Sequence, residues 1–75
     1  MAYINETKML QAVLMDEKLM KVGDYEASEI SDIYQALNSE NYVINAVAQI
    51  IHRTSEGATS QELWREVQSY LFKNV

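Results

Sequence analysis

The sequence contains no cysteine and a single histidine, His52, among its 75 residues. It can therefore form neither a disulfide nor a thiolate metal site, and one imidazole does not make a histidine-rich zinc site. We predict no bound metal and no cofactor. A domain of this size buries only ~60–65% of its unfolded surface, and small domains without disulfides or metals commonly gain stability by association. A homodimer is therefore expected.

Long apolar runs are also missing, because no stretch approaches the ~18 apolar residues that a membrane-spanning helix requires. The N-terminal stretch MAYINETKMLQ lacks the basic and apolar regions of a signal peptide. The absence of cysteine is typical of a reducing compartment. Together these features predict a soluble, cytoplasmic protein.

Positive charge is absent from one long segment, residues 22–52, which contains no lysine or arginine. Five of the 11 acidic residues lie there, and the other six are matched by the six lysines and arginines of the chain. The segment therefore carries the whole formal net charge of −5. Binding to nucleic acid or to an anionic membrane requires basic residues opposite phosphate groups, so this distribution disfavours both partners.

The apolar residues recur at helical spacing, and no stretch alternates as a strand would. We predict an all-α fold, a compact four-helix domain that spans residues 1–75. The first helix is expected to begin after Asn5, a good N-cap, and to end before Gly23, which suits the C′ position. Its two halves place apolar residues on nearly opposite faces. Either it breaks near Asp16, or the second face meets another element or another subunit.

Two more helices are expected in the middle of the chain. One occupies residues 25–37 and can be capped by Asp24 or Ser28. The next occupies residues 40–54 and is apolar over about two-thirds of its circumference. A helix with so wide an apolar surface is buried by neighbours on several sides, so we predict that it is the central element.

A capping box formed by Thr59 and Glu62 marks the start of the fourth helix. The apolar stripe of this helix includes Trp64 and Tyr70, and we assign it to the core. Phe72 lies off the stripe. We therefore predict that Phe72 contacts a partner outside the monomer.

Four acidic residues lie close together early in the acidic segment: Asp24, Glu26, Glu29 and Asp32. Two interpretations are open. The carboxylates face solvent near a helix N-terminus, where the helix dipole favours negative charge, or they form a docking surface for a basic protein partner. A calcium loop is not indicated, because its spaced oxygen ligands, central glycine and distal glutamate are missing.

Met15, Leu19 and Val22 form the second apolar face of the first predicted helix. A small domain has little other surface with which to cover such a face. We therefore predict that these three residues mediate self-association.

The sequence has no glycine-rich phosphate loop, no nucleophile elbow and no His-Glu-x-x-His motif. We expect His52 to be a surface or structural residue and the protein to be no enzyme. The predicted function is a small interaction or regulatory protein that presents a helical, acidic surface to a protein partner. By analogy, this profile is typical of small phage or bacterial regulators and inhibitors.

Two alternatives stay open. One is a helix–turn–helix DNA-binding regulator that uses residues 40–74, with Gln61, Arg65 and Gln68 directed at base edges. Its acidic residues and its long turn weigh against this alternative. The other is a structural subunit of a larger assembly.

Overall fold

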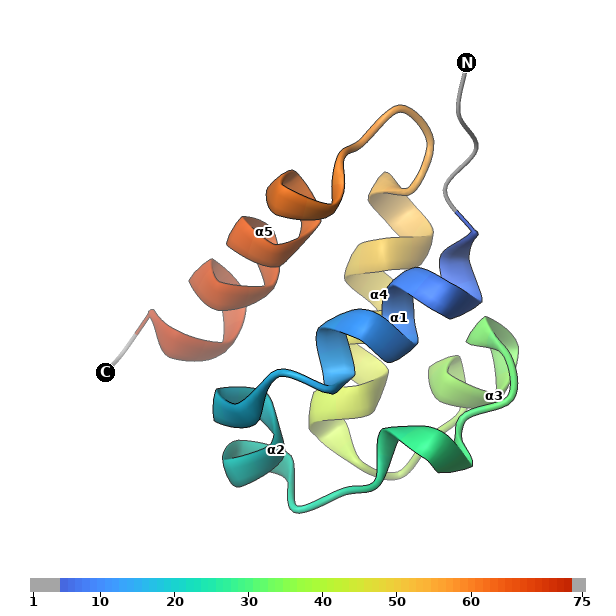
Figure 1. Ribbon diagram of the computed structural model, residues 1–75, viewed down its shortest axis with the longest axis vertical. Helices are drawn as coiled ribbons and strands as arrows, with labels where there is room; N and C mark the ends of the chain where they lie inside the picture. The colour runs from blue at the N-terminus through green and yellow to red at the C-terminus, as the bar shows by residue number, and fades with distance from the viewer. Residues whose placement is uncertain (1–4, 74–75) are drawn as a thin grey trace.

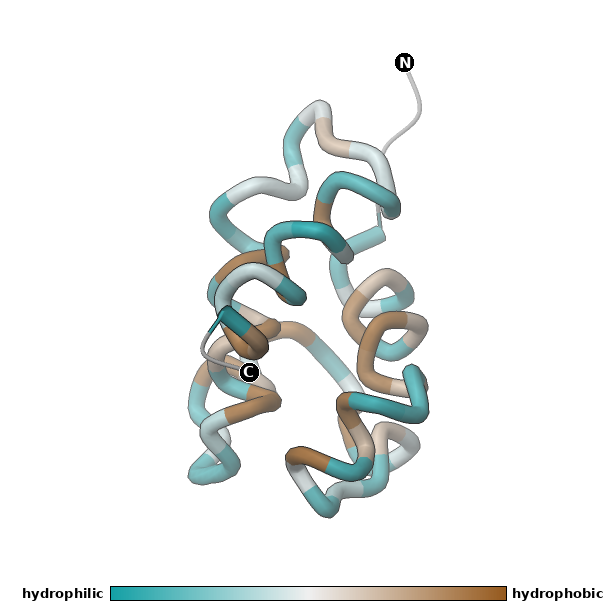
Figure 2. The backbone as a smooth tube through the Cα atoms, turned by 90° about the vertical axis from the view of Figure 1, so that its left-hand side faces the viewer, coloured by the Kyte–Doolittle hydropathy of each residue, from teal (hydrophilic) through white to brown (hydrophobic). Residues whose placement is uncertain are grey.

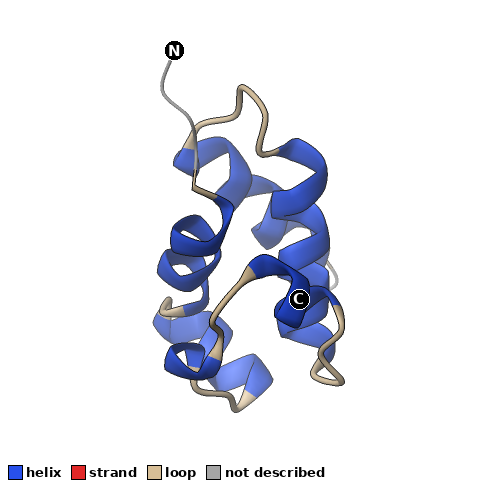
Figure 3. Ribbon diagram, turned by 90° about the vertical axis from the view of Figure 1, so that its right-hand side faces the viewer, coloured by secondary structure: helices blue, strands red, loops and turns tan. Residues whose placement is uncertain are grey.

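Helices are the only regular secondary structure within residues 5–73, the part of the chain that the computed structural model describes (Figure 3). The elements in chain order are α1 (Glu6–Leu14), α2 (Glu17–Gly23), the 3₁₀ helix η1 (Ala27–Glu29), α3 (Ile33–Leu37), α4 (Tyr42–Thr54) and α5 (Ser60–Phe72). The prediction of an all-α fold is confirmed.

α4 is the central helix, as its wide apolar surface predicts. The helices α1, α2, α3 and α5 all contact it, and Figure 1 shows them arranged around it. Hydrophobic and hydrophilic residues are interspersed along the helices, as expected for helices that bury part of their surface and expose the rest (Figure 2). The buried residues of α4 itself are Val43, Ile44, Ala46, Val47, Ala48, Ile50 and Ile51.

The first predicted helix is two helices in the structure, and the break lies at Asp16. A break at this point is one of the two alternatives that the apolar pattern left open. α1 ends at Leu14, and the Asp16 carboxylate caps α2 by accepting a hydrogen bond from Lys18 N at 2.9 Å. The change of direction turns Leu19 into the core, where its exposed fraction is 0%. The described part of the chain therefore has five α-helices rather than the predicted four, because an N-cap aspartate starts a new helix.

The second predicted helix, residues 25–37, is α-helical only over α3. Neither predicted cap is used: Asp24 ends α2 in the left-handed conformation, with φ of 46°, and Ser28 lies within η1. The N-cap of α3 is Asp32, whose carboxylate accepts a hydrogen bond from Gln35 N at 2.6 Å. Short polar side chains that bond to nearby backbone compete with a continuous helix, which explains the irregular course here.

α5 begins as its capping box predicts. Thr59 Oγ1 accepts a hydrogen bond from Glu62 N at 3.2 Å, and the Glu62 carboxylate accepts one from Thr59 N at 3.0 Å. The assignment of the stripe is partly wrong, because Tyr70 is 58% exposed whereas Phe72 is partly buried against the core. Leu63 and Val67 are the buried residues of α5. Phe72 therefore packs partly within the monomer, and its predicted contact with a partner stays a prediction.

The capping box gives a test of the α5 boundary. Thr59→Ala removes the side-chain acceptor for Glu62 N, so we expect the free energy of unfolding to fall by ~1 kcal/mol. Urea unfolding followed by circular dichroism measures the change. The control is Ser60→Ala, one residue later, whose hydroxyl is exposed and caps no helix. An equal loss in both variants would contradict the assigned cap.

Candidate binding groove

An open groove of about 930 Å³ lies between α2, η1 and the junction of α3 with α4. These elements come together at the lower end of the molecule in Figure 1. We call it the acidic groove and define it by its lining residues: Met20, Asp24, Tyr25, Glu26, Glu29, Ile30, Gln35, Asn38, Ser39, Asn41 and Ile44.

Three of the four acidic residues singled out in the sequence line this groove: Asp24, Glu26 and Glu29. All three are exposed, and within residues 5–73 none of them forms an ion pair. Asp32 is not part of the lining, because its carboxylate caps α3. The structure therefore separates one carboxylate with a local structural role from three that face an open groove.

The apolar part of the groove comes from three different elements. Met20 projects from α2, Ile30 follows η1, and Ile44 lies in the first turn of α4. Ile30 and Ile44 are buried, so Met20, which is 42% exposed, supplies most of the accessible apolar surface of this floor. Exposed apolar surface beside three carboxylates suits a ligand that combines positive charge with apolar groups.

The amide side chains of the groove are held by the groove's own backbone. Asn41 Nδ2 donates a hydrogen bond to Gly23 O at 2.9 Å, which ties the start of α4 to the end of α2. The Asn41 oxygen caps α4, so both ends of this side chain are engaged. Two further amide donations to backbone carbonyls are Asn38 to Tyr34 at 2.9 Å and Gln35 to Glu29 at 3.3 Å.

Tyr25 connects the groove to the core. Its hydroxyl donates a hydrogen bond to Leu14 O at 2.8 Å, and its ring packs so closely over Gly23 that any Cβ there would overlap it. Gly23 is therefore required for this packing. It is the last residue of α2 and does not follow the helix as predicted, and Asp24 comes after it in the left-handed conformation. Burial, with a smaller contribution from the Asp16 charge, raises the pKa of Tyr25 to about 12.

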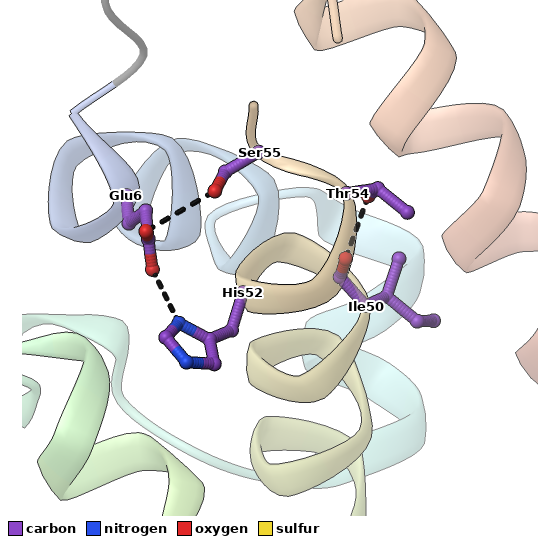
Figure 4. A network of polar contacts seen from close by, with 5 residues as sticks. All are labelled: Glu6, Ile50, His52, Thr54 and Ser55. Atoms are coloured by element: carbon purple, nitrogen blue, oxygen red, sulfur yellow. Dashed lines mark hydrogen bonds and ion pairs between the residues drawn. The ribbon is translucent and has the colours of Figure 1, made fainter. Parts of the chain in front are cut away.

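A second polar cluster lies at the opposite end of α4 and joins it to the start of α1 (Figure 4). The Glu6 carboxylate contacts His52 Nδ1 at 2.8 Å and accepts a hydrogen bond from Ser55 Oγ at 3.1 Å. The Tyr34 ring meets the His52 ring edge-on at 5.9 Å. The Ser55 hydroxyl donates to the carboxylate and not to the imidazole, so the cluster lacks the nucleophile–base contact of a catalytic triad.

The three residues predicted for self-association have different environments. Met15 is 69% exposed and Val22 is 41% exposed, whereas Leu19 is completely buried. The assignment of Leu19 to an exposed face is therefore wrong, because the break at Asp16 rotates α2 relative to α1. Removing a buried leucine costs ~2–5 kcal/mol, so a charge at Leu19 would test folding and not association.

A smaller hollow of about 280 Å³ lies between α1 and the start of α5. Met9 and Val13 of α1 and Trp64 of α5 give it an apolar lining. Trp64 is only partly buried there, although it belongs to the stripe assigned to the core.

No known protein family, curated protein or solved structure matches the chain. Among the described residues, no helix is long and apolar enough to cross a membrane. The same part of the chain has no group of three or more histidine, aspartate and glutamate side chains placed to hold a metal ion. The interpretation of the acidic groove therefore depends on the groove's own residues.

The Tyr25 phenol predicts a loss of stability at alkaline pH. Its pKa is raised from 10.0 to about 12 in the folded protein, so its contribution is fully present below pH 10 and is lost as the pH rises through 12. Urea unfolding at steps across this range should show a declining free energy of unfolding. Tyr25→Phe should remove this part of the decline, and should lower stability by ~1 kcal/mol at neutral pH through loss of the Leu14 hydrogen bond.

Tyr70→Phe is the matched control, because this tyrosine is 58% exposed. If the free energy of unfolding declined equally with pH in wild type and in Tyr25→Phe, the role assigned to the partly buried Tyr25 phenol would be contradicted.

Proposed function

We propose that the protein is a small, non-enzymatic interaction or regulatory protein of the cytoplasm that binds a basic segment of a protein partner in the acidic groove. One observation carries the proposal: Asp24, Glu26 and Glu29 lie unpaired around an open groove that also has an apolar floor. Carboxylates that only stabilise a helix end have no reason to line a groove, so their position favours a docking surface.

Charge and apolar surface have different roles in this proposal. Exposed carboxylates raise the rate of encounter with a basic partner and determine its orientation. They add little affinity individually, because an exposed ion pair contributes ~0–1 kcal/mol. Burial of the exposed apolar surface of Met20 adds to the binding free energy.

DNA binding by α4 and α5 has less support. Arg53 at the end of α4 forms an ion pair with Glu66 of α5, so one of the few basic residues in this half is already neutralised. The connection over residues 55–59 is also longer than the three or four residues of a helix–turn–helix.

Selection of peptides from a display library tests the proposed function. Wild-type protein should enrich peptides that carry lysine or arginine beside apolar residues, and Glu26→Gln with Glu29→Gln should bind them more weakly. For a selected peptide, the association rate should fall with added salt in wild type, because the Debye length shrinks from ~10 Å at 0.1 M to ~3 Å at 1 M. The double variant should associate more slowly and show a smaller salt dependence.

The matched control is Glu17→Gln with Glu56→Gln, which removes the same charge at exposed residues outside the groove. If both double variants changed the association rate equally, net charge and not the groove would be responsible. Selected peptides with no bias toward basic residues would contradict the proposal.

Self-association is a second expected property, now assigned to the exposed Met15 and Val22. Met15→Lys with Val22→Lys should lower the molar mass measured by light scattering while leaving the circular dichroism spectrum unchanged. A wild-type protein that stays monomeric at high micromolar concentration would contradict a homodimer. A mass well above that of a dimer would instead favour a structural subunit of a larger assembly.

A further inference from the structure

One face of α1 is turned to solvent. Figure 1 shows α1 lying in front of α4, on which it packs. Lys8, Ala12 and Met15 follow one another along this face at intervals of four and three residues, and all three are exposed. Met15 is the C-cap and keeps right-handed helical angles, so it extends the ridge of α1. Its exposed fraction of 69% leaves apolar surface in water, which burial against a second surface would remove.

The hollow between α1 and α5 opens beside this ridge. Ala12 belongs both to the ridge and to the lining of the hollow, and the Met9 and Trp64 side chains that also line it are only partly buried. A two-fold axis places the same patch of each copy against the other. An apolar side chain next to an apolar hollow is therefore self-complementary, because Met15 of each copy can enter the hollow of the other.

The charges on α1 determine how two copies would align. In an antiparallel pair with its two-fold axis at Ala12, Met15 of one copy lies opposite Met9 of the other, at the hollow. The same alignment places Lys8 opposite Asp16, and neither of these residues forms an ion pair within residues 5–73. A parallel pair would instead bring Lys8 beside Lys8. Charge complementarity therefore favours the antiparallel alignment, and the small Ala12 side chain lets the helices approach closely at the axis.

We propose that the protein forms a two-fold symmetric dimer through antiparallel α1 helices, in which Met15 of each copy fills the hollow beside Trp64 of the other. This inference rests on the self-association expected together with the proposed function, and it specifies the surface and the register. Methionine suits this position, because its flexible thioether adapts to an irregular hollow and makes favourable contacts with an aromatic ring. Val22 of α2 lies outside this interface.

Cysteine cross-linking tests the register, because the chain has no cysteine of its own. Under the proposed axis Ala12→Cys meets its own copy, and two cysteines whose Cα atoms lie within ~7 Å can form a disulfide. Mild oxidation should convert this variant to a covalent dimer on a non-reducing gel. The matched control is Ser69→Cys, an exposed position of α5 that does not line the hollow, and it should stay monomeric on the gel.

Sedimentation equilibrium of single variants locates the interface. Met15→Lys alone should halve the molar mass, whereas Val22→Lys alone should leave the dimer intact. Circular dichroism checks that each variant keeps its helices.

A charge reversal tests the pairing of Lys8 with Asp16. Lys8→Glu should weaken the dimer, because it places a carboxylate opposite Asp16. Folding should not suffer, since a glutamate in the first turn of α1 suits the helix dipole. Adding Asp16→Asn removes the repulsion while keeping a good N-cap for α2, so it should restore part of the dimer.

The outcomes separate this inference from the proposals that precede it. A wild-type protein that stays monomeric at high micromolar concentration would overturn both this inference and the expected self-association, and would leave the acidic groove unaffected. A dimer that Val22→Lys disrupts and Met15→Lys does not would overturn this inference alone. Equal cross-linking of the Ala12→Cys and Ser69→Cys variants would indicate random collision and would overturn the proposed register.

Discussion

The fold depends on covering the apolar surface of α4 from several sides at once. Seven of the 13 residues of this helix are buried, so a single neighbouring helix cannot shield it. The covering elements include helices as short as five and seven residues, α3 and α2, which are too short to be stable alone. Their stability comes from packing on α4, and the chain must therefore turn sharply and often to place them.

Side-chain capping makes these turns possible in a chain without proline. Each of the five α-helices of residues 5–73 begins at a residue whose side chain accepts a hydrogen bond from the first turn: Asn5, Asp16, Asp32, Asn41 and Thr59. A cap of this kind contributes ~1 kcal/mol, and it also fixes where the helix starts. Asp16 and Asp32 therefore have a structural role, whereas the groove acids Asp24, Glu26 and Glu29 cap no α-helix at its N-terminus.

The sequence predicted best what depends on local pattern. The helical spacing of the apolar residues over 40–54 identified α4, and the capping box identified the start of α5. Burial of Leu19 was missed because it follows from the bend at Asp16, which the apolar pattern allowed but did not require. Three groove acids were found from charge alone. The apolar floor was missed, because Met20, Ile30 and Ile44 come together only when three elements pack on one another.

The grouping of carboxylates would act in opposite directions in the free protein and in the proposed complex. Like charges on Asp24, Glu26 and Glu29 repel one another, and water in the open groove keeps this repulsion weak. A cationic partner would cancel the repulsion and would also exclude water from Met20, which would strengthen the remaining charge interactions. Because Asn41, Asn38 and Gln35 already hold the groove backbone, little ordering remains to oppose binding. In the proposed complex, the carboxylates that repel one another in the free domain would therefore favour binding.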